Sequence, residues 1–423
     1  MAAIPFRKCT SRLSGPGRRS RPLNRIIYLF GILFGVPAIA LAILPGAVLT
    51  VIRRRLGRAP RLVWVGVPVN SHADVSRAMR AVGYETRSIA TERYAQSDGS
   101  RYDHWIPLWR RLPKGLNALV EQVRAYGFFV HALLTVDILH GFFDGGFLRR
   151  TALREHEYWL WKLAGKRLML MPYGRDSFVY SDMPPDELKT ITLKATYPQT
   201  PAEDAAVRRR LARFSTLADV VVGAVGHTVC LPRVDVWTVL WYPGNLALEP
   251  VWPSTRGPIR IAHASNHRGV KGTDELIAAI ERLRARGHDI TLDVIEGVPN
   301  HQVLERFARV DIVVDQLYEG YALAAVEAMS LGKVVISALE SPAAHGPFRE
   351  RSYLGDCPIV SATTATIEGV LAGLIARRSA WPELGQRTHK YARTWHSPDA
   401  SVRLFEGIYD RIWFANPPAR PRS

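Results

Sequence analysis

Two basic residues, Arg268 and Lys271, lie in the segment HASNHRGVKGT at residues 263–273. The segment follows an apolar run typical of a buried strand and precedes an amphipathic run typical of a helix. In an open parallel sheet, ligands bind at the carboxyl ends of the strands, where helix N-termini attract phosphate through their free N–H groups. Fixed cations at that place can stabilise the charge on a leaving diphosphate. The segment is therefore a candidate phosphate-binding loop.

Two glutamates, Glu319 and Glu327, lie in a second segment, DQLYEGYALAAVEAMSLGK at residues 315–333. Their spacing is slightly over two helical turns, which places Glu319 at the mouth of a helix and Glu327 on nearly the same face inside it. Such a pair can bind sugar hydroxyls while nearby backbone N–H groups bind phosphate. By themselves, two glutamates at this spacing are more often a helix-start acid and a surface residue.

The stretch EGYALAAVEAMSLGKVVIS resembles the E-x7-E segment of retaining GT-B glycosyltransferases, in particular those of family four, in which EGFGL is followed by EAMAxGxPVI. The phosphate loop lies upstream at the spacing of that family, and the match covers residues 259–337 closely. Ala322 replaces the usual glycine of the family, and Val334 replaces its proline. Neither change removes a functional side chain, but Ala322 narrows the room beside the phosphate.

The resemblance implies a site for a nucleotide-sugar donor in this half of the chain. Lys271 and Arg268 are expected to bind the donor diphosphate, with Lys271 counted as catalytic, although the arginine of the family usually lies further before the lysine. Glu319 is expected to contact the donor sugar and to act in catalysis, and Glu327 to contact the ribose. The other positions expected to bind the donor come directly after Glu319 in the sequence: Gly320, Tyr321, Ala322 and Leu323. The nucleotide-sugar is a substrate, so no cofactor is expected.

The amino-terminal half matches this family more loosely, as acceptor domains do. The resemblance nominates His140 as catalytic, because it ends a predicted strand where such enzymes often carry a histidine that faces the reacting sugar. A histidine at a strand end is as often a packed or solvated one. Asp144, Arg175 and Asp176 follow this strand and the next one, and they are candidates for binding the acceptor. A turn with an internal arginine–aspartate pair is at least as common there.

Short apolar runs alternate with amphipathic stretches through most of the chain, which predicts an α/β protein with two Rossmann-like, doubly wound domains. A loop rich in Pro, Trp and Gly separates the two halves. We therefore expect an acceptor domain over residues 62–250 and a donor domain over residues 251–396, which face each other across a cleft as in the GT-B fold. A helix over residues 397–414 is expected to return to the first domain, and residues 415–423 to be disordered.

The formal net charge of +18 is concentrated at the amino terminus, where residues 1–61 contain twelve Lys or Arg residues and no Asp or Glu. Residues 26–52 carry no charge and as a helix would be about 40 Å long, against a hydrocarbon core of about 30 Å. Pro37 and Pro45 interrupt this run. We therefore expect a basic tail over residues 1–25 and then a membrane segment that either spans or re-enters. Its basic flanks favour anionic lipid over nucleic acid.

Several chemistries lack their sequence signals. The three cysteines, Cys9, Cys230 and Cys357, lie far apart with no CxxC pair, so neither a disulfide framework nor a structural zinc site is expected. An Asp-x-Asp motif is missing, which argues against a metal-chelated diphosphate. The sequence also lacks a Walker A loop, a G-x-S-x-G elbow and a complete G-x-G-x-x-G. These absences weaken the NTPase, hydrolase and nicotinamide dehydrogenase interpretations.

These observations predict a membrane-attached glycosyltransferase that transfers a sugar from a nucleotide-sugar to a lipid-linked glycan or glycolipid of the cell envelope, with retention and without a metal. Its catalytic domains are expected on the cytoplasmic side of the cell membrane, and the aromatic and basic residues 105–114 are expected to contact lipid headgroups. A non-catalytic, membrane-tethered sugar-nucleotide-binding module and a sugar-nucleotide epimerase are the alternatives. The nucleobase, the sugar, the acceptor and the oligomeric state are not specified by the sequence.

Overall fold

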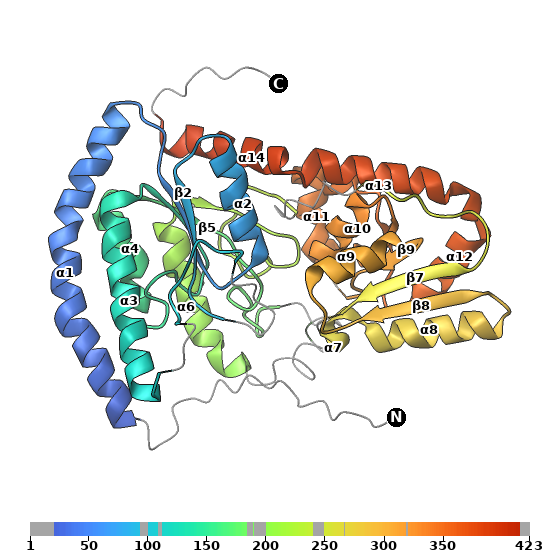
Figure 1. The fold of residues 1–423 in the computed structure, drawn as a ribbon, viewed down its shortest axis with the longest axis horizontal. Helices are drawn as coiled ribbons and strands as arrows, with labels where there is room; N and C mark the ends of the chain where they lie inside the picture. The colour runs from blue at the N-terminus through green and yellow to red at the C-terminus, as the bar shows by residue number, and fades with distance from the viewer. Residues whose placement is uncertain are drawn as a thin grey trace.

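The computed structural model describes residues 21–93, 100–108, 112–183, 189, 200–239, 249–265, 267–318 and 320–414. They form two α/β domains, each built around a parallel sheet, and a long N-terminal helix on the outer side of the first domain (Figure 1). The two parallel-sheet domains predicted from the sequence pattern are therefore confirmed. Most of the expected basic tail, the expected disordered residues 415–423 and the candidate Glu319 lie outside the described residues.

The sheet of the first domain has the parallel strand order β3-β2-β1-β4-β5-β6. Its strands are short apolar runs, as is typical of sheets that are covered on both faces. The sequence of β1 is LVWVG, and every position in it is buried. Because the strand order reverses between β1 and β4, the loops after these two strands diverge and leave room for a ligand. The strands are β1 (Leu62–Gly66), β2 (Thr86–Ala90), β3 (His104–Trp105), β4 (Ile138–Gly141), β5 (Arg167–Leu170) and β6 (Val220–Val221).

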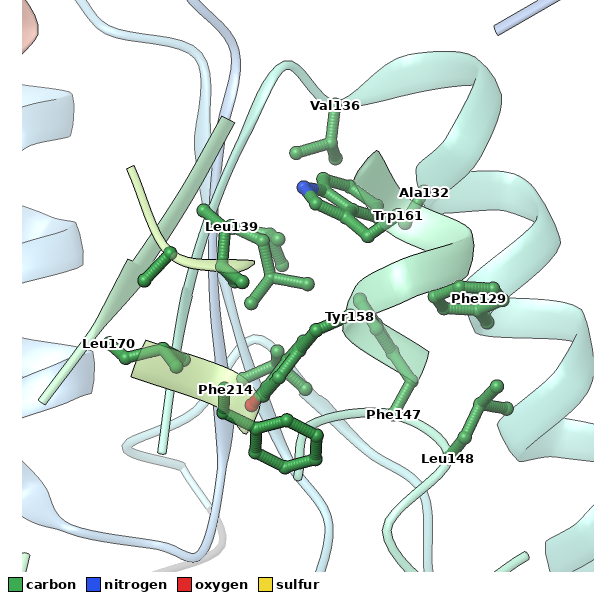
Figure 2. Packing of buried hydrophobic residues seen from close by; sticks show 14 of the residues in the cluster. Phe129, Ala132, Val136, Leu139, Phe147, Leu148, Tyr158, Trp161, Leu170 and Phe214 are labelled. Carbon is green, nitrogen blue, oxygen red and sulfur yellow. The ribbon is translucent and has the colours of Figure 1, made fainter. Parts of the chain in front are cut away.

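Helices cover both faces of this sheet. On one face, α3, α4 and α6 pack on the strands through large apolar side chains, among them Phe129, Leu139, Tyr158, Trp161 and Phe214 (Figure 2). The other face packs against α2 and the last helix of the chain. The helices are α2 (Asn70–Ala81), α3 (Lys114–Thr135), α4 (Glu157–Leu163), which a 3-10 turn (Arg154–His156) precedes, and α6 (Asp204–Leu217).

Helix α1 (Arg21–Arg55) forms the outermost layer of the first domain and runs along α3 (Figure 1). It is longer than the uncharged run of the sequence, and its last turn contains three arginines that complement the helix dipole. Pro37 and Pro45 lie inside this one continuous helix, so the chain does not turn back at either proline. Within the described residues, α1 is the helix that is long and apolar enough to cross a membrane, by length and composition.

The inner face of α1 packs closely on α3 because it carries glycines. A Cβ atom on Gly35 would lie 2.4 Å from the ring of Tyr126. A Cβ atom on Gly46 would lie 2.3 Å from the carbonyl oxygen of Leu133. Real Cβ atoms do not approach other atoms so closely, so this contact depends on the absence of side chains at both positions. The inner face of α1 therefore belongs to the packed interior of the domain.

The buried carboxylate of Asp137 fastens the carboxyl end of α1 to the sheet. Arg53 Nε and Arg61 Nε each donate to Asp137 Oδ2 at 3.1 Å, and the Arg61 backbone N–H donates to the same oxygen at 2.9 Å. Arg54 Nε donates to the carbonyl oxygen of Trp413, beyond the last helix, at 2.8 Å. The end of α1 is thus joined to the starts of β1 and β4 and to the last helix of the chain.

The second domain has the parallel strand order β11-β10-β9-β7-β8. Its strands are β7 (Ile259–Ala264), β8 (Ile290–Ile295), β9 (Ile312–Val314), β10 (Val334–Ser337) and β11 (Val360–Ser361). Its helices are α7 (Arg268–Lys271), α8 (Thr273–Ala285), α9 (Asn300–Ala308), α10 (Leu323–Ser330), α11 (Pro342–Arg351), α12 (Ile367–Ala376) and α13 (Trp381–Trp395). Each strand from β7 to β10 is followed by a helix, so the right-handed crossovers place the helix starts at one edge of the sheet.

The last helix, α14 (Pro398–Ile412), leaves the second domain and packs on the first (Figure 1). Ser397 caps it by accepting the N–H of Ala400 at 3.1 Å, and Pro398 occupies the first turn, where its missing N–H has no helical partner. Phe405 and Tyr409 are buried beside α2 and β1. The helix therefore buries its apolar stripe against the first domain, where the sequence pattern required a surface for it.

The expected lipid contact of residues 105–114 is not supported where the structure describes this segment. Trp105 lies in β3 at the edge of the sheet and is only 6% exposed, and Ile106 is 5% exposed. Arg124 of α3 donates to the carbonyl oxygens of both residues, at 2.5 Å and 2.8 Å. These aromatic and apolar side chains therefore pack inside the domain, because the strand continues the sheet instead of lying on its surface. Residues 109–111 lie outside the described residues.

Candidate functional site

Three groups of the second domain meet at the carboxyl ends of β7 and β9. Lys271 Nζ donates to Asp315 Oδ1 at 2.6 Å, and the backbone N–H of Ala322 donates to Asp315 Oδ2 at 2.6 Å. Asp315 directly follows β9 and is fully buried, while the Lys271 side chain is 11% exposed. Ala322 is the N-cap of α10, where backbone N–H groups lack helical partners. The Asp315 carboxylate therefore occupies an anion-binding position formed by an ammonium group and a helix start.

The candidate phosphate loop folds into the single turn α7, which ends at Gly272 in the left-handed conformation (φ 71°). Lys271 leaves this turn towards the sheet, where it reaches the anion-binding position. Arg268 is 43% exposed and pairs with Asp274 at 2.5 Å and with Glu296 at 3.0 Å. The structure thus brings Lys271 to the anion-binding position but does not bring Arg268 there.

The residues that precede α10 contribute backbone rather than side chains. Gly320 adopts φ 59°, and a Cβ atom on it would lie 2.6 Å from Val225 of the first domain, so glycine is required for both the turn and the close approach. Tyr321 is 2% exposed, and its hydroxyl lies 2.9 Å from His396 Nε2 between α13 and α14. Leu323 begins α10. The loop therefore presents N–H groups at the helix start, while Tyr321 anchors it in the second domain.

Glu327 is buried at the contact between the two domains. Asn300 Nδ2, at the start of α9, donates to Glu327 Oε1 at 2.9 Å. Burial raises the pKa of Glu327 to about 7, and the hydrogen bond from Asn300 and the charge of Arg101 oppose this rise. Arg101 belongs to the first domain, where its Nη2 donates to Asp74 Oδ2 at 2.6 Å. A carboxylate in this position can accept hydrogen bonds from the hydroxyls of a ribose.

His140 is packed inside the first domain rather than exposed to a sugar. Its ring stacks on Trp64 with the centroids 3.8 Å apart. Nδ1 lies 3.1 Å from the carbonyl oxygen of Val63, and Nε2 lies 3.0 Å from the hydroxyl of Tyr409 in α14. Burial lowers the pKa of His140 to about 3, although the hydrogen bond to Val63 opposes this. The catalytic interpretation of His140 is thus corrected in favour of the packed one, because both ring nitrogens are engaged in joining the sheet to α14.

Asp144 follows β4 in a cluster of charged and aromatic side chains at the carboxyl edge of the first sheet. Tyr173, which follows β5, donates its hydroxyl to Asp144 Oδ2 at 2.8 Å, and Arg149 Nε donates to the same oxygen at 2.5 Å. Arg149 also pairs with Glu92, which follows β2. Asp144 Oδ1 is buried and has no hydrogen-bond partner among the described residues. Of the three acceptor candidates, Asp144 is therefore the one with a carboxylate oxygen that has no hydrogen-bond partner among the described residues.

The other two acceptor candidates have structural partners. Asp176 is 2% exposed and shapes the loops after β4 and β5 by accepting three backbone N–H groups at 2.9–3.1 Å, those of Phe143, Tyr173 and Gly174. Arg175 Nη2 pairs with Glu203 Oε2 at 3.1 Å on the surface. The structure therefore brings Asp144 and Asp176 together through Tyr173, and it does not bring Arg175 to them.

Sequence reasoning assigned no role to Asp315, Asn300 or Arg149. A carboxylate directly after a strand was a usable signal for Asp315, because strand ends carry the ligand-binding loops. Arg149 gave no signal, since its partner Glu92 is 57 positions away in the chain. No group of three or more His, Cys, Asp or Glu residues that could hold a metal ion occurs in the part of the chain that the structure describes.

Comparisons with solved structures give the fold its name. HepE from Anabaena, solved with UDP-glucose, matches 84% of this chain and 100% of its own with 12% sequence identity and a TM-score of 0.52. The chain has the GT-B fold. An alpha-glucosyltransferase solved with UDP-glucose and DNA (10% identity, 82% and 99% coverage, TM-score 0.48) and a UDP-N-acetylglucosamine 2-epimerase (12%, 86% and 99%, 0.46) are also similar. No family model and no curated protein matches the sequence.

The buried neutral His140 of this GT-B chain should make folding sensitive to acid. Its folded pKa of about 3 lies below the unfolded value of about 6.5, so its contribution to stability is present above about pH 6.5 and is lost as the pH falls towards 3. In urea titrations between pH 6.5 and 4.5, a His140→Gln variant should show a slope of the unfolding free energy against pH that is smaller by about 1.4 kcal/mol per pH unit.

The loops that Asp176 holds should depend strongly on its carboxylate. An Asp176→Ala substitution leaves three buried N–H groups without an acceptor, which should lower the free energy of unfolding by about 3 kcal/mol or more. Asp182→Ala is the matched control, because Asp182 is 48% exposed and pairs with Arg208 on the surface. Its loss should have a much smaller effect in the same urea titration, because exposed ion pairs contribute little to stability. Equal effects of the two substitutions would contradict the assignment.

Proposed function

We propose that the protein is a glycosyltransferase that transfers a sugar from a nucleotide-sugar donor to an acceptor. The proposal is carried by the convergence of Lys271 Nζ and the Ala322 N–H on one position at the start of α10. A donor diphosphate at this position would gain negative charge as the sugar departs, and an ammonium group and a helix start would stabilise that charge without a metal. Because HepE was solved with UDP-glucose, UDP-sugars are the first donors to test.

Glu327 is assigned to the ribose of the donor. Its carboxylate lies inside the same helix whose start receives the diphosphate, and it already accepts one hydrogen bond, from Asn300. Glu319 is assigned to the donor sugar on its resemblance to the first glutamate of the E-x7-E segment, and retention of the anomeric configuration rests on the same resemblance. Buried His140 takes no part in this assignment, so the groups proposed to act on the departing sugar are Lys271, Glu319 and the helix start.

The binding site of the acceptor is assigned to the first domain. Asp144 Oδ1 is the buried oxygen that can accept a hydroxyl, and Tyr173 and Arg149 hold the other oxygen of the same carboxylate. We propose a lipid-linked glycan or a glycolipid as the acceptor. Helix α1 is long and apolar enough to cross a membrane and has basic residues around it, so it would attach the protein to a membrane. An attached enzyme meets substrates of the same bilayer at high effective concentration. The nucleotide-sugar and the free cysteines Cys230 and Cys357 favour the cytoplasmic face.

Two other functions fit the same groups and are separated by one assay. An epimerase would convert the donor without an acceptor, and a binding module would release no nucleoside diphosphate. The assay incubates the full-length protein with a panel of UDP- and GDP-sugars, with and without a lipid extract of its membranes, and measures nucleoside diphosphate and the free sugar-nucleotides. Release that requires the lipid extract supports the transferase. Conversion of the donor in the absence of the lipid extract would contradict this proposal and support an epimerase.

Lys271 should be needed for transfer, and circular dichroism must confirm that the variant is folded, because Lys271 is the charged partner of the buried Asp315. A Lys271→Met substitution keeps the length of the side chain and removes the charge, so the leaving diphosphate loses its ammonium partner and kcat should fall at least a hundredfold, or about 2.7 kcal/mol. Arg282→Met is the control, because Arg282 is 54% exposed on α8 and pairs with Glu368. Its activity should stay within twofold of the parent. A Lys271→Met protein with full activity would contradict the proposed site.

Asp315 should compete with the donor for Lys271 and the Ala322 N–H. An Asp315→Asn substitution removes the competing charge, so a nucleoside diphosphate should bind about tenfold more tightly in isothermal titration, which corresponds to about 1.4 kcal/mol. Asp274→Asn, which alters the exposed partner of Arg268, should change the affinity less than threefold. Weaker binding by the Asp315 variant would show that this carboxylate positions the Lys271 ammonium group and the Ala322 N–H for the ligand instead of competing with the ligand for them.

A further inference from the structure

The outward face of α1 is a continuous apolar surface. Six of its large side chains are 48% to 79% exposed: Leu33, Phe34, Leu41, Leu44, Val48 and Ile52. Helix α4 lies against the same helix, and a Cβ atom on Gly165, just after α4, would lie 4.0 Å from Ala47. In α4 itself, Trp159 is 45% exposed and Leu163 is 48% exposed. Soluble proteins rarely leave so many large apolar side chains in contact with water, so this face has a partner.

The inward face of α1 cannot serve the same partner, because it is packed on α3 through Gly35 and Gly46. If α1 crossed a membrane as an isolated span, it would have to leave α3 and the buried carboxylate of Asp137. If α3 entered the bilayer with it, Glu121, Arg124 and His131 would enter as well. A charged residue at the centre of a bilayer costs about 2.5–3.5 kcal/mol. Both routes to a spanning helix are therefore unfavourable.

Charge decides between a bilayer and a second copy of the chain. Residues 1–61 contain twelve basic and no acidic residues, so a dimer formed through this face would bring two sets of like charges together. At the carboxyl end of α1, Arg55 and Arg58 are exposed. Each basic residue near an anionic leaflet contributes about 1 kcal/mol to its binding. The apolar face with cations at its ends therefore fits the acyl-chain boundary and the headgroups of an anionic membrane.

We propose that α1 lies in the plane of an anionic bilayer, with its outward face at the acyl-chain boundary and its inward face on α3, so that the amino-terminal tail and both domains stay on one side. Helices of this kind are buried by about 5–10 Å along their whole length. The inference specifies how the attachment in the proposed function is made. It stands apart from the transfer reaction, since each measurement below reads lipid contact and not activity.

Depth measurements distinguish an in-plane helix from a spanning one. An environment-sensitive fluorophore is placed on single cysteines at Leu29, Leu41 or Ile52 of the full-length chain, whose native cysteines are replaced by serine, in vesicles that contain phosphatidylglycerol. Quenchers at fixed depths in the lipid should place all three positions at one shallow depth. A steep gradient, with Leu41 near the centre and the other two near opposite surfaces, would overturn the proposal in favour of a span.

The sidedness of the tail gives an independent check. An impermeant maleimide is added to sealed vesicles that carry the full-length protein with one cysteine in the tail, at Thr10, or in the second domain, at Arg286. Both cysteines should be labelled from the same side and protected from the other. Labelling from opposite sides would show that α1 crosses the bilayer, and it would exclude the in-plane arrangement.

Substitutions on the outward face test the partner itself. A Leu41→Ser/Leu44→Ser variant should lose at least tenfold in its partition onto vesicles that contain phosphatidylglycerol, and the parent should bind poorly to vesicles of phosphatidylcholine alone. Val251→Ser is the control, because Val251 is 46% exposed in the second domain. It should partition like the parent, and circular dichroism should confirm that both variants are folded. Concentration-dependent dimers without vesicle binding would contradict the proposal and assign the face to a second copy.

Discussion

A single buried carboxylate organises the loops at the carboxyl ends of β7 and β9 in the second domain. Asp315 accepts one hydrogen bond from the ammonium group of Lys271, which lies after β7, and another from the N–H of Ala322 at the start of α10. A carboxylate without water must be paired and hydrogen-bonded on both oxygens to remain charged, and here both requirements are met by groups that could also hold a phosphate. The ammonium group and the helix start are thus already paired with a carboxylate, and the nucleotide-sugar proposed to bind here would have to replace this internal anion.

The same loop is coupled to the contact between the domains. Tyr321 leaves the start of α10 and bonds to His396, which directly precedes the cap of α14. Helix α14 in turn packs on the first domain, where Tyr409 bonds to His140. Two buried hydrogen bonds, one just before α14 and one near its carboxyl end, therefore connect this helix to the loop before α10 and to the core of the first domain. Because each of these groups is buried, a change in the position of one must be accommodated by its neighbours.

The sequence was most informative where a motif is local and least informative where a contact joins distant segments. The alternation of strands and helices predicted both sheets, and the stretch from Gly320 to Glu327 predicted the helix start that the structure contains. Asp315 lies 44 positions from Lys271, so spacing alone could not pair them. Trp105 combined with basic residues resembled a surface segment, but only the sheet register shows that it is buried. His140 was ambiguous for the same reason, since its partner Tyr409 is 269 positions away.

The N-terminal helix shows why hydropathy could not separate a spanning segment from a surface one. The hydropathy of a segment is a sum over its residues and takes no account of the helix face on which each residue lies. Glycine and alanine therefore count as apolar whether they face lipid or another helix. In α1 the small residues Gly31, Gly35, Ala42 and Gly46 fall on one side and are buried, while the large leucines fall on the other and are exposed. A helix in lipid on all sides has no need of this division. The segregation of small and large residues, rather than their total, therefore records that α1 has protein on one face and a different environment on the other.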